Sequence, residues 1–366
     1  MKLCLLVPGP PASGDAAAEH ARRLATDHGV EVTLALCEQR PAGTVATRAG
    51  EPRIVAVEDA LAGEYDVALA SGWTTTVHLF AVPARRHALL VERFEHHHLA
   101  PWDPERVGAV LSYDLPVDFV ATGAWVASAL AELRPDARTL VVRSGVDKEL
   151  FAPADATPQA GRPLKVVADI REGEHRVRAA LGAMAEPHAD VLVGPGDGPA
   201  ARAAALAGAD VPLMLADADG ALGLPLEGFH MGATTVVSPS GDAGELVRDG
   251  ENGVVTEPDD PAGAARALDT LARDRARLAT LQMAATRTST AAGWPSWDAS
   301  AAAMAAALRE LLATEPPDAS RWPARLMADA MAAIAVLRNE QHATSQELAR
   351  VRGDEAYRLA MRLRET

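Results

Sequence analysis

Two acidic residues flank a glycine-containing loop in the third quarter of the chain, and their spacing suits a phosphorylated sugar ligand. Asp219 and Glu227 lie eight positions apart, with Gly220 and Gly223 between them. Pro225 favours the first turn of a helix at this point, which would also hold Glu227. Free N–H groups at a helix start bind phosphate, and carboxylates accept hydrogen bonds from sugar hydroxyls. Simple helix capping is the alternative, because the helix dipole stabilises an acid in a first turn without any ligand.

Three consecutive histidines form the other group with potential chemistry. Successive side chains of an extended segment point to opposite faces, so His96, His97 and His98 do not make a natural three-ligand metal site. We expect them to line a loop at a strand end, where one of them could touch a substrate. His96 is our candidate, and a solvated or packed imidazole is the alternative.

The elements that would position these groups are apolar strands that alternate with helices. A helix is predicted over 16–27, with Gly29 in the stop position, and a helical stretch over 261–286. The alternation predicts an α/β fold with parallel strands and helices on both faces of a sheet. Strands are predicted at 3–7, 30–37, 67–70, 88–91, 119–121 and 140–142, and again at 165–168, 190–193, 212–215 and 235–238.

A cluster of prolines with a glycine at 151–163 divides the chain into two alternating units. We therefore predict two doubly wound, Rossmann-like domains, at 1–155 and 162–293. If the two units face each other, ligands would bind in the cleft between them, at the carboxyl ends of the strands.

Composition and local motifs disfavour several other classes of protein. A net charge of −15 disfavours nucleic acid and a strongly anionic membrane surface as partners. The first turn reads V-P-G-P-P without G-x-G-x-x-G spacing, which disfavours a nicotinamide-dependent oxidoreductase. Cys4 and Cys37 lie in apolar runs and are expected as buried free thiols. The apolar run 1–7 is too short for a signal peptide or a membrane span, so a cytoplasmic location is expected, with peripheral binding at the inner membrane face as the alternative.

Residues 318–366 differ from the rest, with eight Arg against seven Asp and Glu. Leu326, Ala330, Ile334 and Leu337 form a stripe at helical spacing. A polar stretch after them interrupts any heptad pattern, so no long coiled coil is predicted. The segment is predicted to be a helical tail for docking or self-association, and a solvated, frayed helix is the alternative.

The order of motifs resembles family-4 retaining glycosyltransferases (glycosyl transferases group 1). Asp219-x7-Glu227, the loop G-A-L-G-L-P and the strand T-V-V resemble the family's E-x7-E segment, and D-G-E-N-G at 249–253 resembles its following turn. S-G-V-D at 144–147 is similar to the domain-boundary motif. W-P-S-W at 294–297, with S-G-W and V-E-R-F-E further upstream, resembles a bacterial, rhamnosyltransferase-like branch that makes surface polysaccharides. The resemblance covers most of residues 1–312.

The resemblance implies the GT-B fold, in which two Rossmann-like domains face each other across a cleft. Residues 1–155 would form the acceptor domain and 162–293 the donor domain. A helix at 294–316 would cross back onto the first domain, ahead of the tail at 318–366. The family uses a nucleoside diphosphate sugar as donor and needs neither a metal nor a cofactor. The donor would pass its sugar to a glycan or a small-molecule acceptor with retention of configuration.

The resemblance also assigns roles to individual residues. Asp219 would contact the donor sugar, Glu227 the ribose, and the amides near Gly223 and Leu224 the diphosphate. Charge on the departing diphosphate would be neutralised as the glycosidic bond breaks. The complete set implied is Asp219, Glu227 and His96 for catalysis; Gly194, Gly220, Gly223, Leu224, Arg171 and Arg176 for the donor; and Gly14, Trp73 and Glu95 on the acceptor side.

The chain departs from the family pattern in ways that leave a second function open. Asp219 stands where the family has Glu, and Arg171 and Arg176 would have to replace its cationic pair. These arginines could instead form exposed ion pairs with neighbouring acids. The interval between Gly194 and Asp219 is also short for the family. The alternative is a catalytically weak or non-catalytic relative that binds an assembly partner through its tail.

Overall fold

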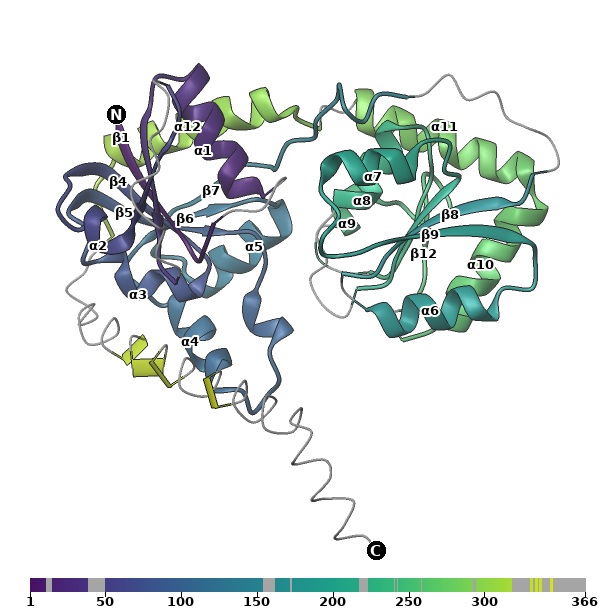
Figure 1. The fold of residues 1–366 in the computed structure, drawn as a ribbon, viewed down its shortest axis with the longest axis horizontal. Helices are drawn as coiled ribbons and strands as arrows, with labels where there is room; N and C mark the ends of the chain where they lie inside the picture. Colours follow the sequence, from purple (N-terminus) through teal and green to yellow (C-terminus); the bar gives the residue numbers. More distant parts are fainter. Residues whose placement is uncertain are drawn as a thin grey trace, which may run out of the picture.

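The computed structural model contains two parallel β-sheets, each flanked by helices (Figure 1). It describes residues 1–10, 15–38, 50–153, 162–171, 173–216, 223–239, 241, 243–257, 259–291 and 294–317, together with 330, 331, 333, 334, 336, 337, 343 and 344.

The first sheet contains seven parallel strands in the order β3-β2-β1-β4-β5-β6-β7. Successive strands are added toward one edge from β1 to β3 and toward the other edge from β4 to β7. The predicted strands of this half are confirmed, and β3 is additional. It is a four-residue edge strand whose first residues are not buried, which leaves too short an apolar run to recognise. The strands are β1 Lys2–Val7, β2 Glu31–Leu36, β3 Arg53–Ala56, β4 Tyr65–Ser71, β5 Ala84–Val91, β6 Asp118–Ala121 and β7 Thr139–Val141.

The second sheet contains five parallel strands in the order β12-β11-β10-β8-β9. Its four predicted strands are confirmed, while the two-residue strand β12 was not predicted because such a short pair carries no period. The strands are β8 Leu164–Asp169, β9 His188–Val193, β10 Val211–Met214, β11 Val236–Val237 and β12 Val254–Val255.

Local capping explains where the longer helices begin and end. Asp15 caps α1 by accepting hydrogen bonds from the amides of Ala17 and Ala18, at 2.9 and 3.2 Å. The helical stretch predicted over 261–286 is two helices, because Asp274 leaves helical geometry and accepts from the amide of Arg277 at 2.9 Å. The helices are α1 Ala16–Asp27, α2 Val57–Ala60, α3 Thr76–Leu79, α4 Pro104–Ser112, α5 Ala124–Leu133, α6 Glu174–Ala183, α7 Pro199–Leu206, α8 Gly223–His230, α9 Ala243–Leu246, α10 Pro261–Arg273, α11 Arg275–Ala291 and α12 Trp297–Ala313, with short 3₁₀ turns η1 Trp73–Thr75 and η2 Glu95–His98.

Helix α12 follows the second sheet in sequence but packs on the first (Figure 1). Met304, Leu308 and Leu311 are buried with residues of β1, β2 and α1 in one apolar cluster. His20 of α1 donates from Nε2 to Ser300 Oγ at 2.8 Å, because Ser300 gives its own proton to the carbonyl of Arg143 at 2.6 Å. The chain therefore returns to its first sheet after completing the second.

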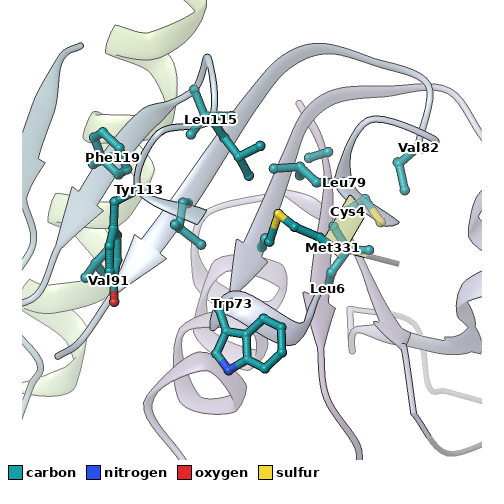
Figure 2. Packing of buried hydrophobic residues seen from close by; sticks show 14 of the residues in the cluster. Cys4, Leu6, Trp73, Leu79, Val82, Val91, Tyr113, Leu115, Phe119 and Met331 are labelled. Carbon is teal, nitrogen blue, oxygen red and sulfur yellow. The ribbon is translucent and has the colours of Figure 1, made fainter. Parts of the chain in front are cut away.

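The tail contacts the body of the same chain through Met331. This side chain is fully buried in the apolar cluster of the first sheet, and Figure 2 shows it among Cys4, Leu6 and Leu79. Ile334, one helical turn further on, packs against the same cluster. The predicted stripe is therefore confirmed at Ile334 and wrong at Ala330 and Leu337, which are exposed because the buried face runs through 331 and 334. Leu326 lies outside the described residues.

Both cysteines are free, as expected from the sequence. Cys4 is buried and Cys37 half-buried, and burial raises the pKa of each thiol to about 12. Neither is a reactive thiolate at neutral pH. In the part of the chain that is described, no helix has the length and apolar character needed to cross a membrane. The same residues contain no cluster of three His, Cys, Asp or Glu side chains arranged to hold a metal ion.

Candidate functional site

A cavity of about 620 Å³ lies between the two sheets. The first domain contributes the start of α1 and the residues that follow β5 and β6. The second domain contributes Arg171, which follows β8, and the N-terminal parts of α7 and α8. The cavity is thus at the carboxyl ends of parallel strands, the position that the sequence predicted for a ligand. Its charged lining residues are Asp15, Glu19, Arg22, Arg23, Glu92, Asp147, Arg171, Arg202 and Glu227.

The two connections between the domains meet at this cavity. The amide of Val146 donates to the carbonyl of Pro295 at 3.1 Å, and Trp294 Nε1 donates to the carbonyl of Ser144 at 3.0 Å. A Cβ on Gly145 would lie 2.5 Å from the Cα of Trp297, so this close approach requires glycine. The S-G-V-D and W-P-S-W motifs therefore form one structural unit, although about 150 residues separate them.

Helix α8 holds Glu227 rigidly at the cavity wall. It packs closely on β10, because a Cβ on Gly228 would lie 2.3 Å from Cγ of Pro212. Leu224, Leu226 and Glu227 are all buried. Glu227 is the fifth residue of the helix, so the expectation that it would lie in the first turn was wrong. Its charge is balanced by a side chain from another helix instead of the helix dipole.

That side chain is Arg202, on the first part of α7. Its Nε lies 3.1 and 2.9 Å from Oε1 and Oε2 of Glu227, and its Nη2 lies 2.7 Å from Oε1. Its Nη1 donates to the carbonyl of Asp197 at 3.2 Å. Burial raises the pKa of Glu227, while the hydrogen bonds and charge of Arg202 act in the opposite direction. Arg202 thus opposes protonation of a carboxylate that burial alone would favour.

Arg171 lies beside the start of α8. Its Nε donates hydrogen bonds to both carboxylate oxygens of buried Asp169, at 2.9 and 3.1 Å. Its Nη2 lies 3.9 Å from the position that a Cβ on Gly223 would take. The second-domain wall therefore presents two arginines, a buried carboxylate and the amides of a helix start within one cavity, an arrangement suited to a phosphorylated ligand with hydroxyl groups.

Other predicted donor residues lie elsewhere. Arg176 of α6 pairs with Asp259 at 2.7 Å and is not among the residues that line the cavity. Gly194 donates from its amide to Asp197 at 2.7 Å, behind the start of α7, and does not line the cavity either. Leu224 packs into the core of the second domain. Asp219, Gly220 and Gly14 lie outside the described residues.

A smaller recess of about 250 Å³ opens from the first domain. It shares Asp15 and Glu92 with the larger cavity and is lined by Glu95 near the carboxyl ends of β4 and β5. Glu95 Oε2 accepts from the amide of Trp73 at 2.6 Å. Burial raises the pKa of Glu95, against the opposing effects of this amide and of Arg93.

Two predicted acceptor-side residues have a different environment from Glu95. Trp73 is buried, and a Cβ on Gly108 would lie 2.5 Å from its ring, so the indole is part of the core. His96 lies on a 3₁₀ turn, where its ring contacts Phe94 and Tyr113 at centroid distances of 5.8 Å. Neither side chain lines either of these two cavities.

Several residues that line the cavity were not predicted from the sequence. Arg202 is the only charged residue between 199 and 209, and a lone arginine in such an apolar helix is a signal that could have identified it. Asp15 was recognisable as a helix cap, but its position at both cavities depends on the fold. The missed residues with charged or aromatic side chains are Asp15, Glu19, Arg22, Arg23, Glu92, Asp147, Phe151, Arg202, Trp294 and Trp297.

One family model matches part of the chain. Residues 173–274 match the family model of glycosyl transferases group 1. No curated protein sequence matches the chain. The matched region contains Arg202 and Glu227, and it covers most of the second sheet.

Solved structures share this architecture at low sequence identity. Sucrose-phosphate synthase from Thermosynechococcus elongatus aligns with a TM-score of 0.71 and 15% identity, over 86% of this chain and 100% of that one. A glycosyltransferase from Rickettsia africae aligns with a TM-score of 0.61 and 13% identity, over 86% and 99%. The Anabaena protein HepE in complex with UDP-glucose aligns with a TM-score of 0.63 and 16% identity, over 85% and 100%. The chain has the GT-B fold, as the resemblance implied.

Proposed function

We propose that the protein is a retaining glycosyltransferase that moves a sugar from a nucleoside diphosphate donor to a hydroxyl group. The observation that carries the proposal is the meeting of Arg171, Glu227 and the start of α8 on one wall of the interdomain cavity. The match to glycosyl transferases group 1 and the UDP-glucose bound by HepE support it.

In this proposal the donor lies against the second domain. Glu227 accepts hydrogen bonds from the ribose, and Asp219 contacts the donor sugar. Arg171 and the amides at Gly223 and Leu224 face the diphosphate, because a cation and a helix start both favour negative charge. As the glycosidic bond breaks, negative charge develops on the departing diphosphate, and these groups stabilise it. No metal ion or cofactor is needed for this step.

The acceptor enters from the first domain through the smaller recess. Glu95 is held by the amide of Trp73, so Trp73 acts through its backbone and its ring serves the core. Asp15 and Glu92 lie where the recess joins the main cavity, and they would accept hydrogen bonds from acceptor hydroxyls. The acceptor attacks from the face that the diphosphate leaves, which retains the anomeric configuration.

We further propose that the donor sugar is a hexose or deoxyhexose and that the product belongs to a bacterial surface glycan. The W-P-S-W and S-G-W motifs carry this part of the proposal. A cytoplasmic location, with access to the inner membrane face, fits a pathway that assembles such glycans. Contacts of the tail with a partner or a second copy remain part of the same proposal.

A thermal-shift screen with UDP, GDP, ADP and dTDP tests nucleotide binding. A ligand that binds only the native state raises the melting temperature, and the rise grows with the logarithm of its concentration relative to its Kd. We expect at least one of these nucleotides to raise it for the wild type and to raise it less for Glu227→Gln. Glu251→Ala is the matched control, since this acid is exposed on the same domain. A wild type that responds to none of the four would refute the proposal.

The non-catalytic alternative is favoured by one contact, because Glu227 already has hydrogen-bond partners on Arg202. The two functions differ in turnover. Incubation with radiolabelled UDP-, GDP-, ADP- and dTDP-sugars, with and without hydroxyl acceptors, separates them. Release of nucleoside diphosphate above the level of Glu227→Gln would exclude the non-catalytic protein.

A further inference from the structure

The contact between Arg202 and Glu227 is a part of the cavity that the proposed function leaves without a role. We propose that Arg202 is a positioning residue: it fixes the orientation and the negative charge of the Glu227 carboxylate, so that this carboxylate binds the two ribose hydroxyls of the donor nucleotide. The inference rests on the proposed function, since it assigns a task to the same subsite.

The geometry of the contact supports a positioning role. Arg202 reaches Glu227 with two different nitrogens, Nε and Nη2, at 2.7 to 3.1 Å. A planar fork of this kind fixes the plane of a carboxylate, whereas a single hydrogen bond does not. Both side chains are held by their helices and are only 11% and 7% exposed. The third nitrogen, Nη1, is bound to the carbonyl of Asp197, which holds the guanidinium in place.

The charge of Glu227 depends on the same contact. A neutral carboxyl group carries a proton on one oxygen and cannot accept two hydrogen bonds from a diol as an ionised one does. Burial pushes Glu227 toward the neutral form, and Arg202 is the main opposing influence. Without Arg202, the carboxyl would hold its proton at higher pH, and the diol would lose an acceptor.

A direct contact between Arg202 and the diphosphate is the competing explanation. Each of the three guanidinium nitrogens of Arg202 has an oxygen partner within the protein. Arg171 is the arginine that lies beside Gly223 at the start of α8, where the proposed function places the phosphates. We therefore propose that Arg171 binds the diphosphate, and that Arg202 positions Glu227, which accepts the hydrogen bonds of the ribose hydroxyls.

Isothermal titration with three ligands separates these explanations. UDP carries both the ribose hydroxyls and the diphosphate, 2′,3′-dideoxy-UDP lacks the hydroxyls, and UMP lacks the terminal phosphate. The proteins are the wild type, Arg202→Gln, Arg202→Lys and Glu227→Gln, with Arg266→Gln as the control because Arg266 lies exposed on the same domain. If the thermal-shift screen selects another base, the analogues of that base replace those of uridine.

We expect Arg202→Gln to weaken UDP binding by about 10- to 100-fold, the range for hydrogen bonds that involve a charged group. The same substitution should change the Kd of 2′,3′-dideoxy-UDP by less than about threefold, and it should add little in the Glu227→Gln background. Arg202→Lys keeps a positive charge without the fork, so it should fold if Arg202→Gln does not, and it should also weaken UDP binding. Arg266→Gln should bind like the wild type.

The pH dependence of UDP binding gives a second readout, which a purely structural arginine would not move. Binding by the wild type should weaken as the pH falls through the folded-state pKa of Glu227, because the ionised form is the acceptor. In Arg202→Gln that loss should begin at a higher pH. Glu227→Gln should show no such transition.

The possible outcomes overturn different statements. Equal losses for UDP and 2′,3′-dideoxy-UDP with little loss for UMP would mean that Arg202 binds the diphosphate, which overturns the inference alone. Unchanged UDP binding and an unchanged pH profile in both Arg202 variants would also overturn it while leaving the proposed function intact. A wild type that binds no nucleoside diphosphate would refute the proposed function, and the inference with it.

Discussion

Two buried arginine–carboxylate pairs, one in each domain, allow a direct comparison. Arg86 of β5 and Asp118 of β6 form an ion pair inside the first domain, with side chains 4% and 3% exposed. Arg86 also donates to the carbonyl of Thr314, just after α12. Arg202 and Glu227 form the pair of the second domain, with side chains 11% and 7% exposed. The first pair lines none of the cavities described above, whereas both members of the second line the interdomain cavity.

The difference shows that burial and pairing do not by themselves identify a functional site. Arg86 joins neighbouring strands to the end of the crossing helix, which is a structural task. Glu227 also forms an ion pair with an arginine, but it lines a cavity in which a ligand can reach the carboxylate. The cavity is therefore the property that separates the two pairs, and variants of each pair should separate folding from binding.

The largest effect on stability is expected for Arg86→Met. Removing this arginine leaves Asp118 buried without its counter-charge, which should lower the free energy of unfolding by about 3–5 kcal/mol. Urea unfolding measures the change. The folded fraction should bind nucleotide with the wild-type Kd, because the pair is remote from the cavity. The double variant Arg86→Met with Asp118→Leu should recover most of the stability, and a double variant as unstable as the single one would contradict this account.

The next largest effect on stability is expected for the buried imidazole of His20, when the pH is lowered. Burial lowers the pKa of His20 to about 4, from an ordinary value of 6.5. Because the folded pKa lies below the unfolded one, stability is complete above pH 6.5 and is lost as the pH falls toward 4. The loss should approach about 3 kcal/mol, at 1.36 kcal/mol per pH unit.

Urea unfolding of the wild type and of His20→Asn between pH 4 and pH 7 tests the assignment. The variant should be less stable at pH 7, since the contact with Ser300 changes, and it should lose the pH-dependent part that comes from His20. Equal slopes in the two proteins would show that folding does not lower the pKa of His20.

Arg202→Met should cost less stability than Arg86→Met, even though the two ion pairs are similarly buried. Water in the interdomain cavity can hydrate the exposed side of Glu227, so we expect a loss of about 1–3 kcal/mol. Binding shows the opposite order, because this variant should lose UDP affinity and Arg86→Met should keep it. Urea unfolding and titration with UDP on the same preparations measure both quantities. A larger stability loss for Arg202→Met would make its ion pair a structural one.

The smallest effect is expected for an exposed pair that also joins distant segments. Arg138 and Glu310 lie 2.8 Å apart and are about half exposed. Glu310→Gln should change the free energy of unfolding by about 0.2–1 kcal/mol, because water and salt screen the interaction. Unfolding at low and high salt should show that even this contribution falls as the ionic strength rises. A change comparable to that of Arg86→Met would contradict the link between burial and cost.

The fold was largely predictable because its strands carry a strong local signal. Buried parallel strands are continuous apolar runs, and all ten predicted runs are strands of the two sheets. The two strands that were missed, β3 and β12, are a short edge strand and a two-residue pair with little apolar sequence. The tail was predicted less well: Ile334 packs on the core as expected, but Met331 is buried beside it, while Ala330 and Leu337 are exposed. A helix with apolar residues on several sides does not determine which side packs.

The site was predictable only in part. Glu227, Gly223 and Arg171 line one cavity as a local motif suggested, because they follow strands that end at the same edge. Trp73 was expected near the acceptor, but the absence of a side chain at Gly108 gives its ring a place in the core. Arg202 was missed, since its partner lies 25 residues away and nothing local links the two.

The sequence by itself determined the alternation of strands and helices, the break between the two units and the E-x7-E-like motif, because these depend on neighbours along the chain. The tertiary structure decided which charges meet. It brings Arg202 into contact with Glu227, buries Trp73 and packs Met331 into the apolar cluster of the first sheet. Such contacts depend on how helices pack against sheets, and a change of one residue in packing register turns a buried side chain toward solvent.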